Sequence, residues 1–189
     1  TLSRIVSRPD LARVPPRASA SLEKLAKELA LVACVTGRPA PTVQDMVNAK
    51  GGVHGRKIKL QSYDDKFDPK LAAENTKKLL NEDKVFSLFG IIGTGATVAT
   101  MPLATEQAVP VVGALSGADG LRDPKLKLLF HTRASYSDET GKMVEQLTST
   151  GVKSIAVVYQ DDPFGKAGLK SAQGAFARQG VKPVIEAAI

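Results

Sequence analysis

The sequence is poor in the residues that most often carry catalysis or cross-link a fold. Its 189 residues include no tryptophan, one cysteine and two histidines, and aromatic residues make up only 5%. The single cysteine, Cys34, excludes an internal disulfide and any metal site that is built from several cysteines. With so few aromatic residues, we do not expect a large aromatic binding surface within this sequence.

Long apolar runs are also missing, and none approaches the length of a membrane-spanning helix. Residues 31–34, Leu-Val-Ala-Cys, look like the acylation box of a bacterial lipoprotein signal. Such a signal needs a longer uncharged stretch before its cleavage site, and four charged residues lie between positions 23 and 28. We therefore interpret residues 29–35 as a buried first strand that carries a small thiol.

The net charge is positive, but it is spread along the chain. The sequence has 26 Lys and Arg residues against 19 Asp and Glu residues, which gives a net charge of +7. Because the basic residues are not interleaved with aromatic ones, we interpret them as solvated surface and predict no nucleic-acid partner. Asp64, Asp65 and His54 have no partner nearby in the sequence for acid–base or metal chemistry, so we predict neither a metal site nor a cofactor.

The most informative stretch that the sequence does contain is Val85–Gly117. It reads as a short apolar strand, a glycine-rich loop, a helix, a second apolar strand and a loop of small residues, at 85–89, 90–96, 97–107, 109–112 and 114–117. This order predicts a right-handed βαβ unit in a parallel sheet. In such sheets ligands bind outside the carboxyl ends of the strands, where both loops are expected.

The glycine-rich loop also opens a helix, which gives it a specific chemistry. Gly95 and Ala96 could present free backbone N–H groups at the positive end of the helix dipole, and Thr94 could add a hydroxyl. Such donors suit a carboxylate or a phosphate. A tight strand-to-helix turn that binds nothing is the alternative. We expect the loop to face solvent when no ligand is bound.

The rest of the pattern predicts an α/β fold. Strands near 29–35, 57–63, 85–89 and 109–112 are expected to form one parallel sheet with helices on both faces. Asp68 and Pro69 predict a helix start, and further strands are expected at 128–132, at 154–159 and from 182. Residues 1–20 are rich in Arg, Pro and Ser and are expected to be a mobile arm, followed by a short helix over 21–29. A helix capped at Ser137 or Asp138 and another over 164–179 complete the prediction.

Six blocks of sequence, in consistent order, are similar to one known family. They are GGVHGRKIKL, YDDKFDPKLAAENTKKLL, FGIIGTG, PLATEQAVPVVGALSGA, RASYSDE and IAVVYQDDPFGKAGL. Together they resemble the type I periplasmic binding proteins, in the Leu/Ile/Val-binding branch that feeds ABC importers. The resemblance covers residues 31–189. It implies two doubly wound, Rossmann-like lobes that close on a ligand.

The same resemblance implies a division of the chain. Residues 1–28 are an arm and short helix that are largely unmatched, 29–135 form the first ligand-binding lobe, and 136–189 begin a second lobe that is incomplete. The region between Gly37 and Gly51 is shorter than usual in the family, so one first-lobe ligand contact has no clear counterpart. A second lobe that has only been started leaves strand edges and apolar surface open, which predicts self-association.

The resemblance also implies ligand-binding residues. Thr94 matches the position whose hydroxyl binds the carboxylate or amino group of the ligand. Leu115, Ser116 and Gly117 match the next ligand loop, although the family's hydroxyl more often lies one residue later than Ser116. Phe164 matches an aromatic position of the second lobe that faces the cleft.

The function implied is non-enzymatic binding of a small amino acid or a related polar molecule for ABC-type import. The location implied is the periplasm, although the sequence shows no convincing signal peptide, and the partners implied are the ligand and the membrane subunits of an importer. One alternative is a nucleotide- or phosphate-binding enzyme domain, but the spacing of Gly90, Gly93 and Gly95 is not GxGxxG and no GK[ST] follows it. The other is a truncated fragment without ligand activity.

Overall fold

The computed structural model describes residues 28–34 and 41–189. Its contacts divide the chain into two compact units, one made of 1–30 with 40–60 and the other of 31–39 with 61–189. The predicted arm over 1–20 and the side chain of Cys34 lie outside the described residues. The predicted helix over 21–29 lies largely outside them too, and its last two residues belong to a strand.

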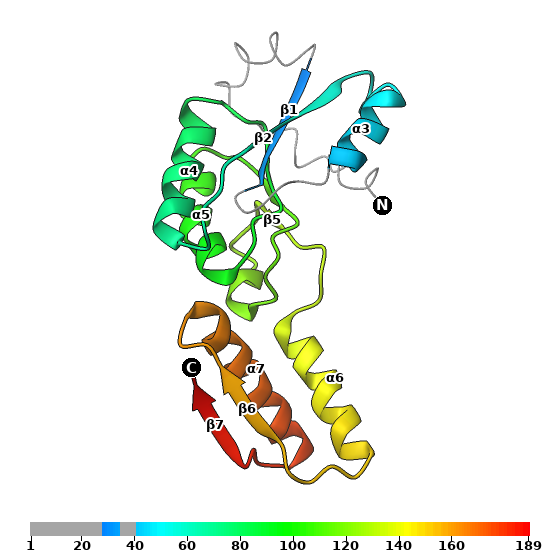
Figure 1. Cartoon of the computed structure of the whole chain (residues 1–189), viewed down its shortest axis with the longest axis vertical. Helices are drawn as coiled ribbons and strands as arrows, with labels where there is room; N and C mark the ends of the chain where they lie inside the picture. Colours follow the sequence, from blue (N-terminus) through cyan, green and yellow to red (C-terminus); the bar gives the residue numbers. More distant parts are fainter. Residues whose placement is uncertain (1–27, 35–40) are drawn as a thin grey trace. The chain divides into compact units, whose positions relative to one another are not determined.

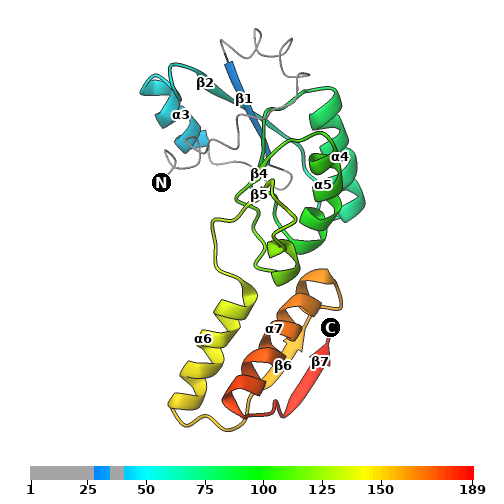
Figure 2. The same ribbon diagram turned by 180° about the vertical axis from the view of Figure 1, so that it is seen from behind.

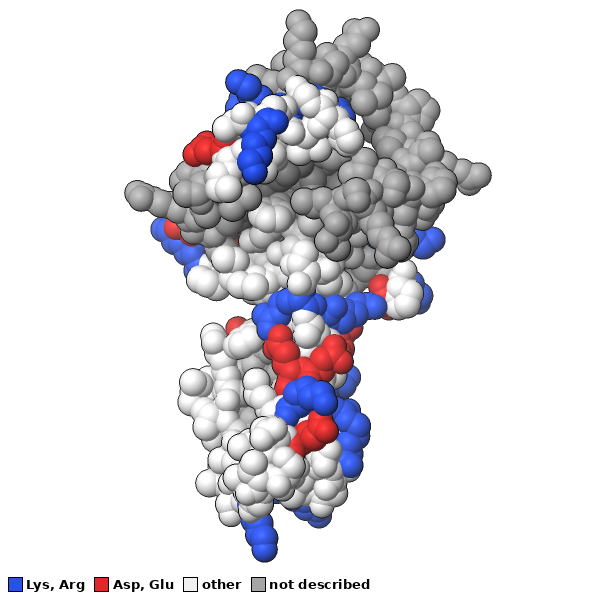
Figure 3. All heavy atoms as spheres, turned by 90° about the vertical axis from the view of Figure 1, so that its right-hand side faces the viewer, with Lys and Arg blue, Asp and Glu red and all other residues white. Residues whose placement is uncertain are grey.

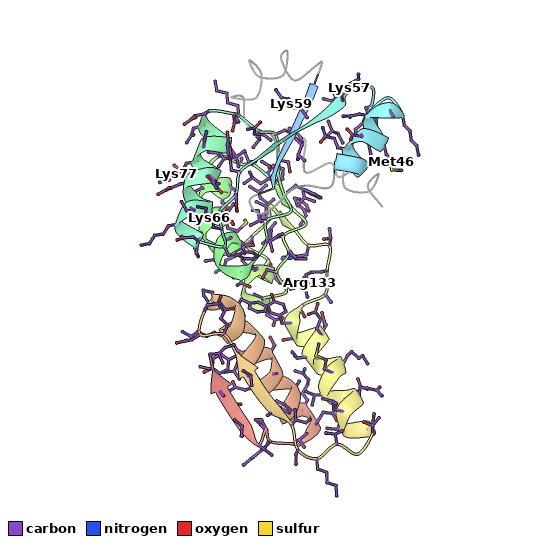
Figure 4. The ribbon with its side chains drawn as sticks, viewed as in Figure 1. Met46, Lys57, Lys59, Lys66, Lys77 and Arg133 are labelled. Atoms are coloured by element: carbon purple, nitrogen blue, oxygen red, sulfur yellow. The ribbon has the colours of Figure 1, made fainter. Side chains whose placement is uncertain are left out.

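The first unit contains a helix held against a strand by one side chain. β1 (Glu28–Cys34) and β2 (Lys57–Ser62), each shared with the second unit, form a two-stranded sheet, and α3 spans Pro41–Ala49. Asn48 of α3 donates its amide to the Ile58 carbonyl at 2.8 Å and accepts the Ile58 N–H at 2.7 Å. The strand predicted near 57–63 is confirmed, and its exposed Lys57 and Lys59, labelled in Figure 4, alternate with the half-buried Ile58 and Leu60.

The second unit is built on a parallel sheet of very short strands. β3 (Leu88–Phe89), β4 (Val111–Val112) and β5 (Leu129–Phe130) lie side by side in that order, so the predicted parallel βαβ unit is confirmed. The ladder stops early because Pro110 has no N–H to extend it before Val111. Gly90 and Gly113, with φ of 69° and 67°, turn the chain away directly after β3 and β4.

One expectation about the sheet differs from the structure. Among the described residues, β1 and β2 pair with each other and share no ladder with β3, so the four predicted strands are not joined into one sheet. The predicted strand over 85–89 is reduced to two ladder residues, because Val85 donates its N–H back to the Leu79 carbonyl at 3.1 Å. The strand therefore begins too late to extend the sheet over the predicted length.

Two helices cover the sheet of the second unit and pack on each other. α4 (Pro69–Asn81) and α5 (Thr94–Glu106) lie side by side in both ribbon views (Figures 1 and 2). Their contact includes the buried hydroxyls of Thr76 and Thr100, 3.0 Å apart. The fully buried large apolar side chains of this core are Leu79, Leu88, Ile91 and Val111.

The remaining α-helices of this unit, α6 and α7, begin at side-chain caps, as α4 does. Asp68 caps α4 by accepting the Lys70 N–H at 2.6 Å, as predicted. α6 spans Tyr136–Ser149 and begins earlier than predicted, because Ser135 and Asp138 form a reciprocal capping box. Asp162 caps α7 (Pro163–Gln179) by accepting the Gly165 N–H at 2.8 Å.

The last segment is a helix pair on a small sheet. β6 (Ala156–Tyr159) pairs in parallel with β7 (Ile185–Ala188), and both lie along α7 in Figures 1 and 2. Val144, Ala172, Ala175 and Phe176 form a second core under this sheet. A short 3-10 helix, η3 (Asp119–Arg122), contacts α7 through Asp119, which accepts the Ser171 hydroxyl at 2.9 Å.

Charged side chains of both signs intermix on the face seen in Figure 3, where no large area of the described surface carries one sign alone. Two of the ion pairs, Lys142–Glu145 and Lys166–Asp161, join exposed side chains. Such pairs contribute little to stability, so the fold depends on its cores and caps.

Two glycines of α7 form a matched pair for a test of packing. A Cβ added at Gly165 would lie 2.0 Å from the Gln160 carbonyl oxygen, whereas a Cβ at Gly168 would meet nothing within 4 Å. We expect Gly165→Ala to lower the free energy of unfolding by about 1–3 kcal/mol, because backbone must move. Gly168→Ala should be neutral or stabilising by up to about 1 kcal/mol. Denaturant unfolding measures both, and equal effects would contradict the packing described for Gly165.

The outer face of the β6–β7 sheet generates a prediction of self-association. Val158 and Ile185 are 63% and 59% exposed and lie on the face opposite the second core. Exposed apolar strands recruit other chains, so we expect the 189-residue polypeptide to associate as its concentration rises. Val158→Lys should reduce this association, and Val98→Lys, at an exposed valine of α5, should not. A clean monomer at high concentration in sedimentation would contradict the prediction.

Candidate functional site

Two loops are joined side by side at the carboxyl edge of the β3–β4–β5 sheet. Beyond the strand ends, Leu115 donates its N–H to the Ile91 carbonyl at 2.7 Å, and Gly93 donates its N–H to the Leu115 carbonyl at 3.3 Å. An isolated parallel bridge between Ile92 and Leu115 results. The glycine-rich loop and the small-residue loop therefore lie together, as the βαβ pattern predicts.

The two loops also share a pair of hydroxyl groups. Thr94 Oγ1 lies 2.8 Å from Ser116 Oγ, and the two residues are only 4% and 0% exposed. The expectation that the glycine-rich loop faces solvent without a ligand is therefore wrong for Thr94. The backbone hydrogen bonds between the two loops hold the Thr94 and Ser116 side chains against each other, so both are buried.

The direction of this hydrogen-bond chain bears on what Thr94 can do. Ser116 Oγ accepts the N–H of Ala118 at 3.3 Å. If Ser116 uses its own proton toward Thr94 Oγ1, the Thr94 hydroxyl keeps its proton free to donate elsewhere. Hydrogen bonds in such a chain polarise one another, which makes the last donor stronger.

The helix that starts here lacks a side-chain cap. Gly93 is the N-cap of α5, with φ of 100°, and has no side chain to accept a backbone N–H. Thr97 donates to the Gly93 carbonyl, but the N–H groups of Thr94, Gly95 and Ala96 find no acceptor among the described residues. Because α4, α6 and α7 are capped by side chains, α5 is the described α-helix of the second unit whose positive end remains open to an anion.

The other two predicted residues of the second loop differ in burial: the Leu115 side chain is half-exposed, whereas Gly117 is buried. Both backbone groups of Leu115 already have partners in the first loop, and its side chain is 50% exposed. Gly117 is buried, and a Cβ there would lie 2.5 Å from Cδ1 of Tyr136, so this position must be glycine for the ring to fit. The Gly117 carbonyl accepts the Tyr136 N–H at 2.6 Å.

Phe164, the predicted aromatic residue, is half-exposed and belongs to a row of stacked groups. Its ring meets the buried ring of Tyr136 edge to face, with centroids 5.7 Å apart and an interplanar angle of 75°. The guanidinium of Arg133, labelled in Figure 4, lies 5.4 Å from the centroid of the Tyr136 ring. These contacts fix Tyr136, which in turn supports Phe164.

The structure adds residues that the sequence pattern did not single out. A Cβ on Gly95 would lie 3.0 Å from Cγ of Pro69 and 4.0 Å from Cγ of Pro163, so the starts of α4, α5 and α7 converge at Gly95. The ring of Phe67 is 70% exposed and lies 3.9 Å from the Cβ position of Gly93. An aromatic residue directly before a predicted N-cap was the available signal for Phe67, but nothing in the sequence shows which way it points.

Asp65 shapes the turn that carries Phe67. It is fully buried, and its Oδ1 accepts the Phe67 N–H at 2.9 Å, while its Oδ2 has no hydrogen-bond partner among the described residues. Burial raises the pKa of the Asp65 carboxyl, and the nearby carboxylates Asp64 and Asp68 act in the same direction. The described residues contain no group of three or more side chains that could hold a metal ion.

Residues 42–188 match the family model described as Periplasmic binding protein. The chain belongs to this family. Among curated relatives, it is 27% identical over 175 residues to "Leu/Ile/Val-binding protein homolog 7" of Brucella suis, covering 87% of this chain and 43% of that protein. It is 24% identical over 150 residues to an "Amino acid binding protein" of Pseudomonas aeruginosa, covering 78% of this chain and 40% of that protein.

Solved structures show the same likeness. A possible leucine/isoleucine/valine-binding protein from Rhodopirellula baltica superposes with a TM-score of 0.73 at 27% identity, over 84% of this chain and 46% of that one. The resemblance to type I periplasmic binding proteins and the doubly wound α/β fold are therefore confirmed. The chain spans less than half the length of these relatives, and no helix among its described residues is long and apolar enough to cross a membrane.

The Thr94–Ser116 pair generates a prediction about stability. Thr94→Val keeps the shape but leaves the buried Ser116 hydroxyl without its partner, so the free energy of unfolding should fall by about 1–3 kcal/mol. Adding Ser116→Ala should recover part of that loss, because both hydroxyls are then absent. Denaturant unfolding of Thr94→Val, Ser116→Ala and the double variant forms a double-mutant cycle. If the two single losses of stability add up to the loss in the double variant, the hydroxyls are not coupled.

Asp65 generates a prediction about pH. Its folded-state pKa lies above the ordinary value of 3.8, so its contribution to stability falls as the pH rises from 3.8 through that raised pKa. The amide in the Asp65→Asn variant cannot ionise, so the stability of this variant relative to the unchanged chain should rise with pH across the same window. The slope is at most about 1.4 kcal/mol per pH unit for one proton. A stability difference that is independent of pH would contradict the assignment.

Proposed function

We propose that this chain supplies the first-lobe wall of a ligand cleft that binds a small carboxylate, an amino acid or a close relative of one, for an ABC importer. The observation that carries the proposal is the uncapped start of α5 beside the Thr94–Ser116 hydroxyl pair. In this arrangement the Thr94 hydroxyl and the N–H groups of Thr94, Gly95 and Ala96, which have no acceptor among the described residues, all lie in the first turn of α5.

The chemistry of those donors suits a carboxylate. One carboxylate oxygen would accept the Thr94 hydroxyl proton, and the other would accept the N–H of Gly95 or Ala96. Hydrogen bonds to a charged acceptor are stronger than neutral ones, and the positive end of α5 adds to them. The neighbouring helix starts do not compete, because Asp68 and Asp162 already occupy them.

The comparisons support this ligand class. The relatives named above are called binding proteins for amino acids or for Leu, Ile and Val. Solute-binding proteins from Rhodopseudomonas palustris were solved with benzoate and with 3,4-dihydroxybenzoic acid, at 22% and 24% identity to this chain, which shows the shared fold alone. The amino acids named for the two curated relatives are small carboxylic acids, which is the ligand class proposed here.

The proposed role also sets the location and the partners. Membership of the family supports a periplasmic location, where the protein would deliver its ligand to the membrane subunits of an importer. Binding of this kind forms and breaks no covalent bond, so it needs preorganised donors and no nucleophile or general base. The open start of α5 would also suit the phosphate of a nucleotide- or phosphate-using enzyme, but the relatives named above are binding proteins for amino acids, which favours the carboxylate.

A ligand screen followed by titration tests the proposal. Thermal-shift measurements with L-leucine, L-valine and benzoate should show stabilisation by at least one of them, since a ligand of the folded form raises stability. For that ligand, Thr94→Val should weaken binding by roughly one to two decades, at 1.4 kcal/mol per decade, because a hydrogen bond to a charged group is lost. Thr94→Ser keeps the hydroxyl and should bind nearly as well.

The titration must be made on variants shown to be folded at the temperature used. Equal affinities for the unchanged chain and a folded Thr94→Val variant would remove Thr94 from the site. A chain that none of the three compounds stabilises would count against the proposed function itself.

A further inference from the structure

Phe67 is an exposed aromatic side chain held in a conformation that an aromatic residue rarely adopts. Its φ is 61°, that of Lys66 is 50°, and the Phe67 side chain is 70% exposed. Positive φ is strongly disfavoured for bulky residues, and a solvent-facing turn of this kind would ordinarily use Gly or Asn. Nothing in the packing of the described residues requires a large apolar ring here.

The surrounding side chains hold this turn in place. Asp64 accepts the Lys66 N–H at 2.8 Å and Asp65 accepts the Phe67 N–H at 2.9 Å, so two consecutive backbone groups are fixed by two consecutive carboxylates. The carbonyl of Asp65 accepts the N–H of Asp68 at 2.8 Å, which ties the turn to the start of α4. These hydrogen bonds fix the backbone of the turn that carries the exposed Phe67 ring.

The ring is presented at the proposed carboxylate site. Cδ1 of Phe67 lies 3.9 Å from the Cβ position of Gly93, the N-cap of α5. The rings of Pro69 and Pro163 lie 3.0 Å and 4.0 Å from the Cβ position of Gly95, in the first turn of α5, and the residue after Pro163 is the half-exposed Phe164. The uncapped N–H groups of α5 are thus bordered by apolar rings that come from the starts of α4 and α7.

We propose that Phe67, together with Phe164, forms aromatic walls of the ligand site and selects a carboxylate whose body is an aromatic ring. This inference rests on the proposed function, because it takes the carboxylate to lie at the start of α5. With the carboxylate there, the body of the ligand meets Phe67 on the α4 side and Phe164 on the α7 side. Aromatic pairs in offset or edge-to-face contact attract each other beyond the area that they bury.

Three monocarboxylates separate aromatic selection from general apolar binding. Benzoate and cyclohexanecarboxylate have similar size and the same charge and differ in the aromatic ring, and L-leucine adds an amino group to an aliphatic body. Calorimetric titration of the 189-residue chain should rank benzoate above cyclohexanecarboxylate and L-leucine. Phe67→Ala should weaken benzoate roughly three- to tenfold and should abolish most of its advantage over cyclohexanecarboxylate.

Two further variants exclude a merely structural role for Phe67. Phe86→Ala removes an aromatic side chain that is 47% exposed and precedes β3, away from the carboxyl edge of the sheet, and should leave all three affinities unchanged. Phe67→Gly relieves the positive φ, so its melting temperature should rise while its affinity for benzoate falls.

The titrations distinguish a failure of the proposed function from a failure of the aromatic selection alone. If none of the three compounds binds the unchanged chain, the proposed function is overturned and this inference falls with it. If a compound binds but benzoate has no advantage, or Phe67→Ala binds benzoate as tightly as the unchanged chain, only the aromatic selection is overturned.

Discussion

The site depends on the hydrogen bonds between two loops at the carboxyl edge of the short sheet. The strands end at Phe89 and Val112, yet Leu115 continues the pairing through Ile91 and Gly93. This continuation places Thr94 against Ser116 and fixes the direction in which α5 leaves the loop. Without this pairing, the position of the hydroxyl pair relative to the free N–H groups of α5 would not be fixed. Neither feature alone would then indicate a ligand site.

Glycine is required at two points for this arrangement to form. Gly93 combines a φ of 100° with the absence of a side chain, which leaves the first turn of α5 uncapped. Gly117 lacks a Cβ, so the Tyr136 ring can seat against the second loop. The first glycine leaves donors free, and the second lets the α6–α7 segment bring Phe164 to the same edge. These two glycines therefore allow the hydroxyl pair, the free N–H groups of α5 and Phe164 to lie at the edge of the sheet where we propose that the ligand binds.

Much of the fold was predictable from the sequence, because its signals are local. Asp68–Pro69 marks a helix start, and the apolar runs around Leu88 and Val111 mark parallel strands, which the structure confirms. The helix predicted over 164–179 begins one residue earlier, at Pro163. The strands are shorter than predicted because Pro110, Gly90 and Gly113 limit the ladder. Whether β1 and β2 join that ladder depends on long-range pairing, which no local pattern shows.

The site was less predictable for the same reason. The sequence indicated Thr94 and Ser116 as hydroxyl donors but not that they bind each other and are buried, since that contact joins residues 22 positions apart. Phe67 was missed because its exposure follows from the left-handed backbone of Lys66 and Phe67, and neither residue type predicts that conformation. The sequence showed Asp65 only as a carboxylate without a partner for acid–base or metal chemistry, whereas in the structure its Oδ1 accepts the Phe67 N–H and holds the turn.

In the proposed complex, the backbone at the start of α5 receives the carboxylate of the ligand. Amide resonances of the ¹⁵N-labelled chain, followed during titration with the carboxylate that binds best, test this directly. We expect the N–H signals of Gly95 and Ala96 to move downfield and to saturate together with the calorimetric isotherm. A ligand that saturates the chain while these two signals stay in place would contradict the account.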